Sequence, residues 1–109
     1  MIVSRENIDN KQEIARIEYE NAIPFSHVCI DNLFEPTFLS KIIDDIIILK
    51  TEKWWKYNNI FEKKNAYNNF QKMSSNLQEY FNFVNGVFFT RFLQNISGID
   101  NLVSDPSLY

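Results

Sequence analysis

Hydrophobic residues recur along this chain with two periods, and the clearest helical period lies in residues 36–50. Apolar side chains fall there every three or four positions, on a stripe made of Leu39, Ile42, Ile43, Ile46, Ile47 and Leu49. Pro36 occupies the first turn, where a missing N–H costs nothing. Because β-branched residues form helices poorly on their own, we expect this helix to be held by packing against a sheet.

Residues 9–21 form a second amphipathic pattern, in which Asn10 and Glu13 have the spacing of a capping box. The side expected to be buried carries Ile14, Ile17 and Ala15. We therefore expect an N-terminal helix with a solvated polar face.

Two short helices are predicted near the C-terminus. Ser74 or Ser75 can cap the first, and Asn85 can cap the second. Gly98, followed by Ile99, fits a left-handed C-cap with its hydrophobic contact. The residues expected to point inward are Leu77, Tyr80 and Phe81 in the first helix, and Phe88, Phe89, Phe92, Leu93 and Ile96 in the second.

A period of two, typical of strands, marks three other segments. Val28 and Ile30 alternate within residues 25–30, and residues 54–58 and 60–67 are strand-like pieces joined around a turn at Asn58 and Asn59. The predicted order is α, β, α, ββ, α, α. This order places the chain in the α+β class.

The bulk composition fits a single domain or part of one, spanning residues 1–109. The hydrophobic fraction of 45% can build a core, and a net charge of −3 provides no basic field for nucleic acid or an anionic membrane. One cysteine cannot form an internal disulfide, so we expect a reducing, cytoplasmic setting. The sequence has no signal-peptide pattern, no apolar run long enough to span a bilayer and no Gly-rich phosphate loop.

His27 and Cys29 are the only residues of their kinds and fall two apart on the predicted strand. A structural zinc site needs four such ligands, and a Cys–His nucleophile pair needs a third group that orients the base. We therefore expect a packed, hydrogen-bonded histidine and an inert buried thiol. The sequence predicts no catalytic, cofactor-binding or metal-binding residue in this chain.

Aromatic and basic residues interleave between Lys53 and Lys72, and include Trp54, Tyr67 and Phe70. Nucleic-acid bases can stack on such rings while lysines follow the phosphate backbone. Glu52, just before this stretch, and Glu62 within it dilute the patch, and the whole chain is acidic. Packing with a solvated outer face is therefore the favoured interpretation over nucleic-acid binding.

The closest carboxylates are Asp44 and Asp45, with Asp31 earlier in the chain. Neighbouring helical residues point about 100° apart, so this pair cannot face each other across a substrate as glycosidase acids do. We expect capping or surface roles for all three.

Five stretches occur in a fixed order: residues 24–34 (PFSHVCIDNLF), 55–59 (WKYNN), 62–64 (EKK), the Asn85 helix ending in Ile96-Ser97-Gly98-Ile99, and 102–109 (LVSDPSLY). Together they resemble the N-terminal portion of the 2-oxoglutarate- and Fe(II)-dependent oxygenases of the prolyl 4-hydroxylase-like group. The resemblance covers roughly residues 10–109 and rests on the order and spacing of the pieces.

The resemblance implies an oxidoreductase that activates O₂, decarboxylates 2-oxoglutarate to succinate and hydroxylates an unactivated C–H bond. In that family a His-x-Asp and a later His hold the iron, and they follow the segment that resembles residues 102–109. The triad needs two histidines, and this chain has only His27, which matches a structural strand histidine of the family. No catalytic position carries over, and Fe(II) and 2-oxoglutarate are implied only for a complete family member.

The resemblance also refines the expected fold. It implies N-terminal helices and outer strands that normally support a double-stranded β-helix (jelly-roll) core, here truncated. The chain is then a fragment, one part of a split gene, or a remnant reused for binding. We expect it to be the scaffold part of a dioxygenase (hydroxylase), not catalytic by itself, with a homo-oligomer or a partner chain covering its barrel-facing surface. The alternative is a stand-alone protein-interaction or single-strand nucleic-acid-binding module.

Overall fold

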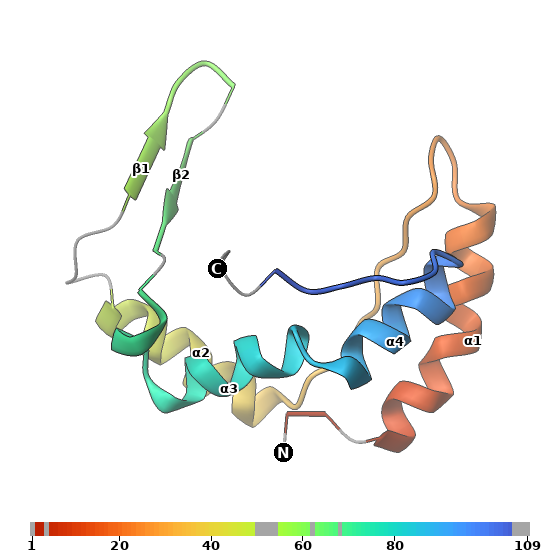
Figure 1. The fold of residues 1–109 in the computed structure, drawn as a ribbon, viewed down its shortest axis with the longest axis horizontal. Coiled ribbons are helices and arrows are strands. Elements are labelled where there is room, and N and C mark those ends of the chain that lie inside the picture. Colours follow the sequence, from red (N-terminus) through yellow and green to blue (C-terminus); the bar gives the residue numbers. More distant parts are fainter. Residues whose placement is uncertain (1, 4, 50–54, 62, 68, 106–109) are drawn as a thin grey trace.

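Helices form the base of the structure, a computed structural model that describes residues 2–3, 5–49, 55–61, 63–67 and 69–105. The elements are α1 (Arg5–Asn21), α2 (Pro36–Leu49), β1 (Trp55–Asn58), β2 (Lys63–Ala66), a 3₁₀ turn (Phe70–Lys72), α3 (Ser75–Val84) and α4 (Val87–Ser97). Two arms rise from the helical base, one formed by β1 and β2 and the other by residues 22–30 beside α1, and the C-terminal segment runs between them (Figure 1).

The predicted α+β class is wrong, because the only sheet among the described residues is the hairpin of β1 and β2. The two strands are antiparallel, with Trp55 opposite Ala66 and Asn58 opposite Lys63. This hairpin confirms the predicted pair of strands, but the connection lies later than predicted: Asn58 is the last residue of β1, and Ile60 and Phe61, expected in the second strand, precede β2. The predicted ends at Lys50 and Trp54 lie outside the described residues, as does Glu62 within the second strand.

Residues 25 and 26 lie in a bend and residues 27–30 have no regular secondary structure, so the predicted first strand is absent. Val28 and Ile30 are half-buried all the same, because they pack against the hydrophobic core. The period of two in this segment therefore reflects the burial of alternate side chains. It does not indicate a strand within a sheet. The prediction of outer strands that support a jelly-roll core is therefore also wrong.

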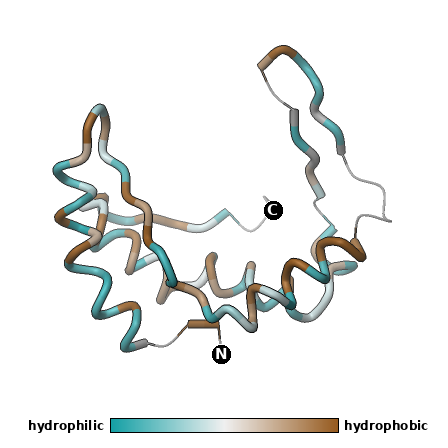
Figure 2. Tube along the Cα trace, turned by 180° about the vertical axis from the view of Figure 1, so that it is seen from behind, coloured by the Kyte–Doolittle hydropathy of each residue, from teal (hydrophilic) through white to brown (hydrophobic). Residues whose placement is uncertain are grey.

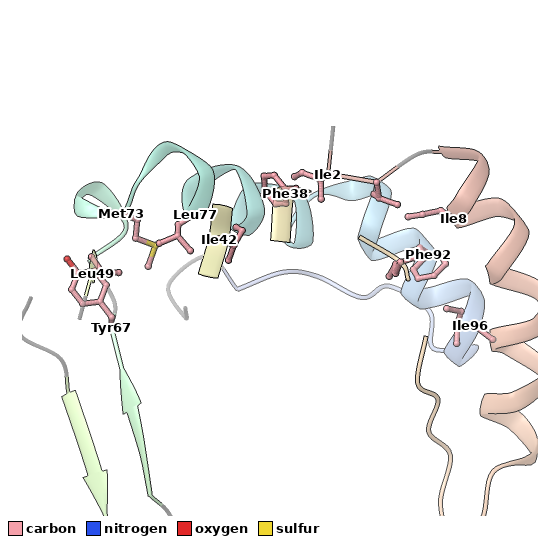
Figure 3. Packing of buried hydrophobic residues seen from close by; sticks show 13 residues of the cluster. Ile2, Ile8, Phe38, Ile42, Leu49, Tyr67, Met73, Leu77, Phe92 and Ile96 are labelled. Atoms are coloured by element: carbon pink, nitrogen blue, oxygen red, sulfur yellow. The ribbon is translucent and has the colours of Figure 1, made fainter. Parts of the chain in front are cut away.

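α1 and α4 pack against each other at one end of the base. Ile8 and Ala15, seven positions apart on α1, are buried, as are Phe92 and Ile96 on α4 (Figure 3). Residues seven apart lie on one face of a helix. This contact is the deepest packing in the described chain, and Ile8 is only 2% exposed.

The predicted inner face of α1 is therefore wrong for two of its three residues. Ile14 is 60% exposed and Ile17 is also exposed, whereas Ala15 is buried as expected. The cause is the start of the helix. It begins at Arg5, so that Ile8 lies inside it and sets the buried face, and Asn10 lies within the helix and not at its cap.

α2 packs on α3 and not on a sheet, which corrects the expected partner of this helix. Phe38, Ile42 and Leu49 are its buried residues, and Leu77 and Met73 are buried on the α3 side (Figure 3). The packing surface is therefore another helix, and it holds only part of the β-branched run: Ile42 is buried and Ile46 is half-buried, whereas Ile43, Ile47 and Ile48 are exposed.

Helix ends confirm some of the predicted caps. The Ser74 hydroxyl accepts a hydrogen bond from the Leu77 N–H at 3.2 Å, and Gly98 adopts a left-handed φ of 73°. The cap predicted at Asn85 is wrong, because Asn85 ends α3 and Gly86 begins α4 without a side-chain cap. An N-cap residue is extended, as Gly86 is with a ψ of 164°, whereas Asn85 keeps a helical backbone with a ψ of −2°.

An aromatic cluster joins the two halves of the base. The ring centroid of Phe34 lies 5.8 Å from that of Tyr80, 6.2 Å from that of Phe83 and 6.4 Å from that of Phe89. The predicted inward side of α3 is confirmed, since Leu77 is buried and Tyr80 and Phe81 are half-buried. The buried residues thus follow the base in a strip and do not form a round core (Figure 3).

Candidate docking surface

His27 and Cys29 are both exposed, so the prediction of a packed histidine and a buried thiol is wrong. The predicted hydrogen bond of the histidine is present, because its Nδ1 lies 2.8 Å from the carbonyl oxygen of Phe25. The imidazole also lies near the Phe25 ring, with centroids 5.3 Å apart. In the part of the chain that the structure describes, no three His, Cys, Asp or Glu side chains form a metal-ligand group.

Cys29 lines a groove of about 240 Å³ between α1 and residues 29–32. The lining also holds Lys11 and Glu18 but not His27, so the groove does not assemble the Cys–His pair considered from the sequence. The Lys11 ammonium donates to the Asp31 carbonyl oxygen at 2.9 Å. This hydrogen bond fixes the arm against α1, which is a structural role and not a catalytic one.

The aromatic-basic stretch separates into core and surface. Tyr67 is buried and Phe70 is half-buried, whereas Lys56 and Lys72 are exposed. Lys53 and Trp54 lie outside the described residues. Rings that are packed in the core cannot stack on nucleic-acid bases, so the described part of this stretch favours the packing interpretation.

The carboxylates of α2 have different surroundings. Asp44 is exposed, as expected, whereas Asp45 accepts hydrogen bonds from the Ser74 hydroxyl and, at 3.2 Å, from the Asn76 amide. Asp45 therefore links α2 to the start of α3. Asp31 is exposed at the turn that follows the extended arm.

Exposed charges on α1 form a local network. Arg16 donates to Glu13 and to Glu20, the latter at 3.4 Å. The hydrogen bond from Arg16, and then its positive charge, lower the pKa of Glu13 from its ordinary value. The two carboxylates in turn raise the pKa of Arg16. This network is a solvated surface, as the sequence predicts for this face.

α2 carries a second apolar face, which we call the outer stripe: Leu39, Ile43 and Ile47. The three residues are four positions apart, so they share one side of the helix. Ile43 is 58% exposed and Ile47 is 57% exposed, although the sequence predicts burial for the whole apolar stripe. The described chain covers only one of the two apolar faces of α2.

Both arms end in exposed apolar residues. Ile60 and Phe61 at the tip of the hairpin are 90% and 89% exposed, and Ile23 and Phe25 lie exposed on the other arm (Figure 2). Further large exposed apolar side chains are Ile48 on α2 and, from α4 into the C-terminal segment, Val87, Phe88, Leu93, Ile99 and Val103. Phe88 and Leu93 thereby correct the predicted inner face of the last helix.

The surface area measures how open the molecule is. The chain exposes 8399 Å², whereas a compact monomer of 13.0 kDa exposes about 6,300 Å². The radius of gyration of 15.9 Å likewise exceeds the value of about 13 Å for a compact domain of this length. The excess area, about 2,000 Å², is larger than the share of about 800 Å² that one partner contributes to a standard interface. This area counts polar and apolar atoms together, and the exposed apolar residues of the outer stripe, the arm tips and α4 within it are the candidate functional site.

No helix among the described residues is long and apolar enough to cross a membrane. Comparisons with known protein families, curated proteins and solved structures give no significant match.

Proposed function

We propose that this chain is a non-catalytic scaffold on which the catalytic portion of a 2-oxoglutarate- and Fe(II)-dependent dioxygenase packs. The observation that carries the proposal is the open frame with its excess of about 2,000 Å² of exposed surface. The order of sequence pieces that resembles the prolyl 4-hydroxylase-like oxygenases supports the identity of the covering body.

The surface chemistry supports a protein as the covering body. The outer stripe of α2 and the tips of the two arms are apolar, and burying apolar area is the main driving force of protein association. Two separate arms with exposed apolar tips fit a body that contacts both. We therefore propose one partner that touches the base and both arms together.

The iron-binding residues belong to the covering body in this proposal. A His-x-Asp…His triad in that body would hold Fe(II), which together with 2-oxoglutarate would supply the oxidising chemistry. This chain offers one histidine, His27, whose ring is bonded to its own arm through the Phe25 carbonyl. We assign to this chain the work of positioning the body and excluding water from the contact. A cytoplasmic location stays a prediction.

The second candidate is a stand-alone interaction module that uses the same surface without an oxygenase. A homo-oligomer is its simplest form, because the same excess area can be buried between copies. This candidate predicts no turnover of 2-oxoglutarate in any complex, whereas the first predicts turnover, so one experiment distinguishes the two.

The test compares this chain alone with this chain co-expressed with the polypeptide that carries the His-x-Asp…His triad. We expect the chain alone to self-associate and to bind a hydrophobic-surface dye, as measured by light scattering and fluorescence. We expect the complex to show a single mass in light scattering, to bind little dye, and to convert 2-oxoglutarate to succinate with Fe(II). A triad His→Ala variant of the partner should keep the complex and lose the turnover.

The contrary outcomes are distinct. A well-behaved monomer of 13.0 kDa that binds no dye would contradict the need for a covering body. Turnover by the chain alone would contradict its non-catalytic role. A stable complex or oligomer without turnover would favour the interaction module.

A further inference from the structure

A groove of about 310 Å³ lies between α4 and the segment that follows this helix. The chain turns back after Gly98 (Figure 1), and the Leu102 N–H donates to the side-chain oxygen of Gln94 at 2.8 Å. This hydrogen bond holds the returning segment beside α4. The groove includes exposed apolar residues of α4 and of that segment, so it forms part of the candidate docking surface.

Apolar and polar side chains share the lining of the groove. Val87 and Val103 are 68% and 88% exposed, so their methyl groups are open to a partner. The Thr90 hydroxyl is instead used within the chain, since it donates to the Gly86 carbonyl oxygen at 2.8 Å. The groove therefore offers apolar contact area, and part of its polar lining is already engaged.

Arg91 is the one charged residue among the described residues that line the groove. It is exposed and has no ion pair or hydrogen bond with another described residue. Arg16 differs in this respect, because two glutamates of α1 engage its guanidinium. Asp100, the other charged residue within residues 85–104, does not line the groove. The Arg91 guanidinium is therefore a cation without a counter-charge beside apolar walls.

This guanidinium selects the chemistry of the occupant. Arginine presents its N–H donors in a planar fork that matches the two oxygens of a carboxylate. A phosphate group carries about two negative charges at neutral pH, and it would meet one cation in a chain whose net charge is −3. Arginine is also enriched at the centres of protein interfaces, where apolar neighbours exclude water from its contacts. The groove therefore suits a single carboxylate with apolar groups on both sides.

We propose that this groove takes an acidic side chain of the covering body, flanked by apolar residues, with its carboxylate on Arg91. The inference rests on the proposed function and adds the partner chemistry that the docking surface recognises. The apolar flanks contact Val87 and Val103, whereas the ion pair fixes where along α4 the segment lies. A charge pair of this kind contributes more to orientation and specificity than to affinity.

The experiment is an NMR titration of the full chain with five-residue peptides, at a concentration where light scattering shows one species. The first peptide, Ala-Leu-Glu-Leu-Ala, is capped at both ends so that its only charge is the glutamate. The second and third have Gln and Lys in place of Glu. We expect the Glu peptide to shift the backbone amide signals of residues 87–94 and 102–104. The Gln peptide should bind about fivefold more weakly, because an exposed ion pair contributes little.

Variants assign the preference to Arg91. In Arg91→Gln, the Glu and Gln peptides should bind equally. Arg91→Lys keeps the charge but lacks the planar fork, so it should retain only part of the preference for the Glu peptide. The control is Lys41→Gln, which removes a positive charge at an exposed position of α2 and should leave the preference unchanged. All three variants should keep the melting temperature of the wild-type chain, because both positions are exposed.

Four outcomes would overturn the inference: no shift of the groove amides by the Glu peptide, equal binding of the Glu and Gln peptides, a preference that persists in Arg91→Gln, or equally tight binding of inorganic phosphate. The last would indicate an unselective anion site. These outcomes are independent of oxygenase activity. The groove can prefer the Glu peptide even if no complex turns over 2-oxoglutarate, and turnover can occur in a complex that leaves the groove empty.

Discussion

The packing of α1 on α4 and the hairpin arm show two opposite ways of holding a small structure. Phe92 on α4 is 3% exposed and contacts the Phe89 ring at a centroid distance of 5.7 Å. Phe61 at the tip of the hairpin is 89% exposed. The first region is stabilised by buried side chains of the chain itself, whereas the second has backbone pairing and leaves the apolar side chains at its tip exposed. The hairpin is therefore the region that depends most on a partner.

The second arm, residues 22–30, is anchored to the rest of the chain less than the α1–α4 contact and more than the hairpin. Asn7 on α1 donates through its amide to the carbonyl oxygens of Asn32 and Leu33, each at 3.0 Å, where the arm returns to the base. The Glu35 N–H donates to the Ile2 carbonyl oxygen at 2.8 Å. These bonds anchor the arm to the N-terminal part of the chain, and its tip at Ile23 and Phe25 still lies exposed.

Amide exchange in the isolated chain tests the difference between the α1–α4 packing and the hairpin, and it should show the largest effect of all the experiments. Exchange protection follows the free energy of local opening, which is near zero for poorly packed segments and reaches the global value in the core. We expect the amides of β1 and β2 to exchange at least about a hundredfold faster than those around Phe92 in α4. Equal protection of the two regions would contradict the difference.

Matched Phe→Ala substitutions sharpen the same comparison. Phe92→Ala removes a buried ring and should lower the free energy of unfolding by about 3–5 kcal/mol, measured by urea denaturation. Phe61→Ala is the same chemical change at an exposed position and should alter it by less than about 0.5 kcal/mol. A large loss in Phe61→Ala would mean that the hairpin tip is buried, for example between copies.

The helical base was largely predictable because its signals are local. Pro36 marks the start of α2, the apolar spacing carries it to Leu49, and Gly98 ends α4 in the left-handed conformation that glycine favours. The caps were predictable where one serine served one helix, as at Ser74. Each of these features depends on residues within a few positions of one another.

The errors concern what lies opposite each apolar residue, which local sequence does not specify. The alternation of Val28 and Ile30 is real, but a strand needs a neighbour, and none of the described residues supplies one. Ile43 and Ile47 belong to one apolar stripe with Ile42, yet α3 covers only the part that includes Ile42. Part of the candidate docking surface consists of such residues, for which the sequence predicts burial but the described chain provides no cover. The tips of the arms carry no such signal, because their apolar residues follow no helical or strand period.

Asp45→Ala tests the link between α2 and the start of α3. Its expected effect on the free energy of unfolding is smaller than that of Phe92→Ala. It removes the acceptor for Ser74 and Asn76, and hydrogen bonds to a charged group each stabilise by about 1.5–3 kcal/mol. We expect a loss in this range in urea denaturation. The control Asp44→Ala, at the exposed neighbouring position, should be nearly neutral. Equal effects would show that Asp45 acts only as a surface charge.

The smallest expected effect comes from the exposed network on α1, far from the buried face of that helix. Arg16 lowers the pKa of Glu13 through a hydrogen bond and then through its charge. A carboxyl whose pKa is lower in the folded state stabilises that state above its unfolded pKa, and the contribution is lost as the pH falls through the folded pKa.

Melting temperatures at about pH 7 and about pH 3 measure this contribution. The fall in melting temperature should be slightly larger for the wild-type chain than for Arg16→Gln, and salt should shrink the difference because both side chains are solvated. A difference that persists in high salt would indicate that a partner or a second copy covers this face of α1. The polar face of the helix would then belong to the docking surface together with the apolar arms.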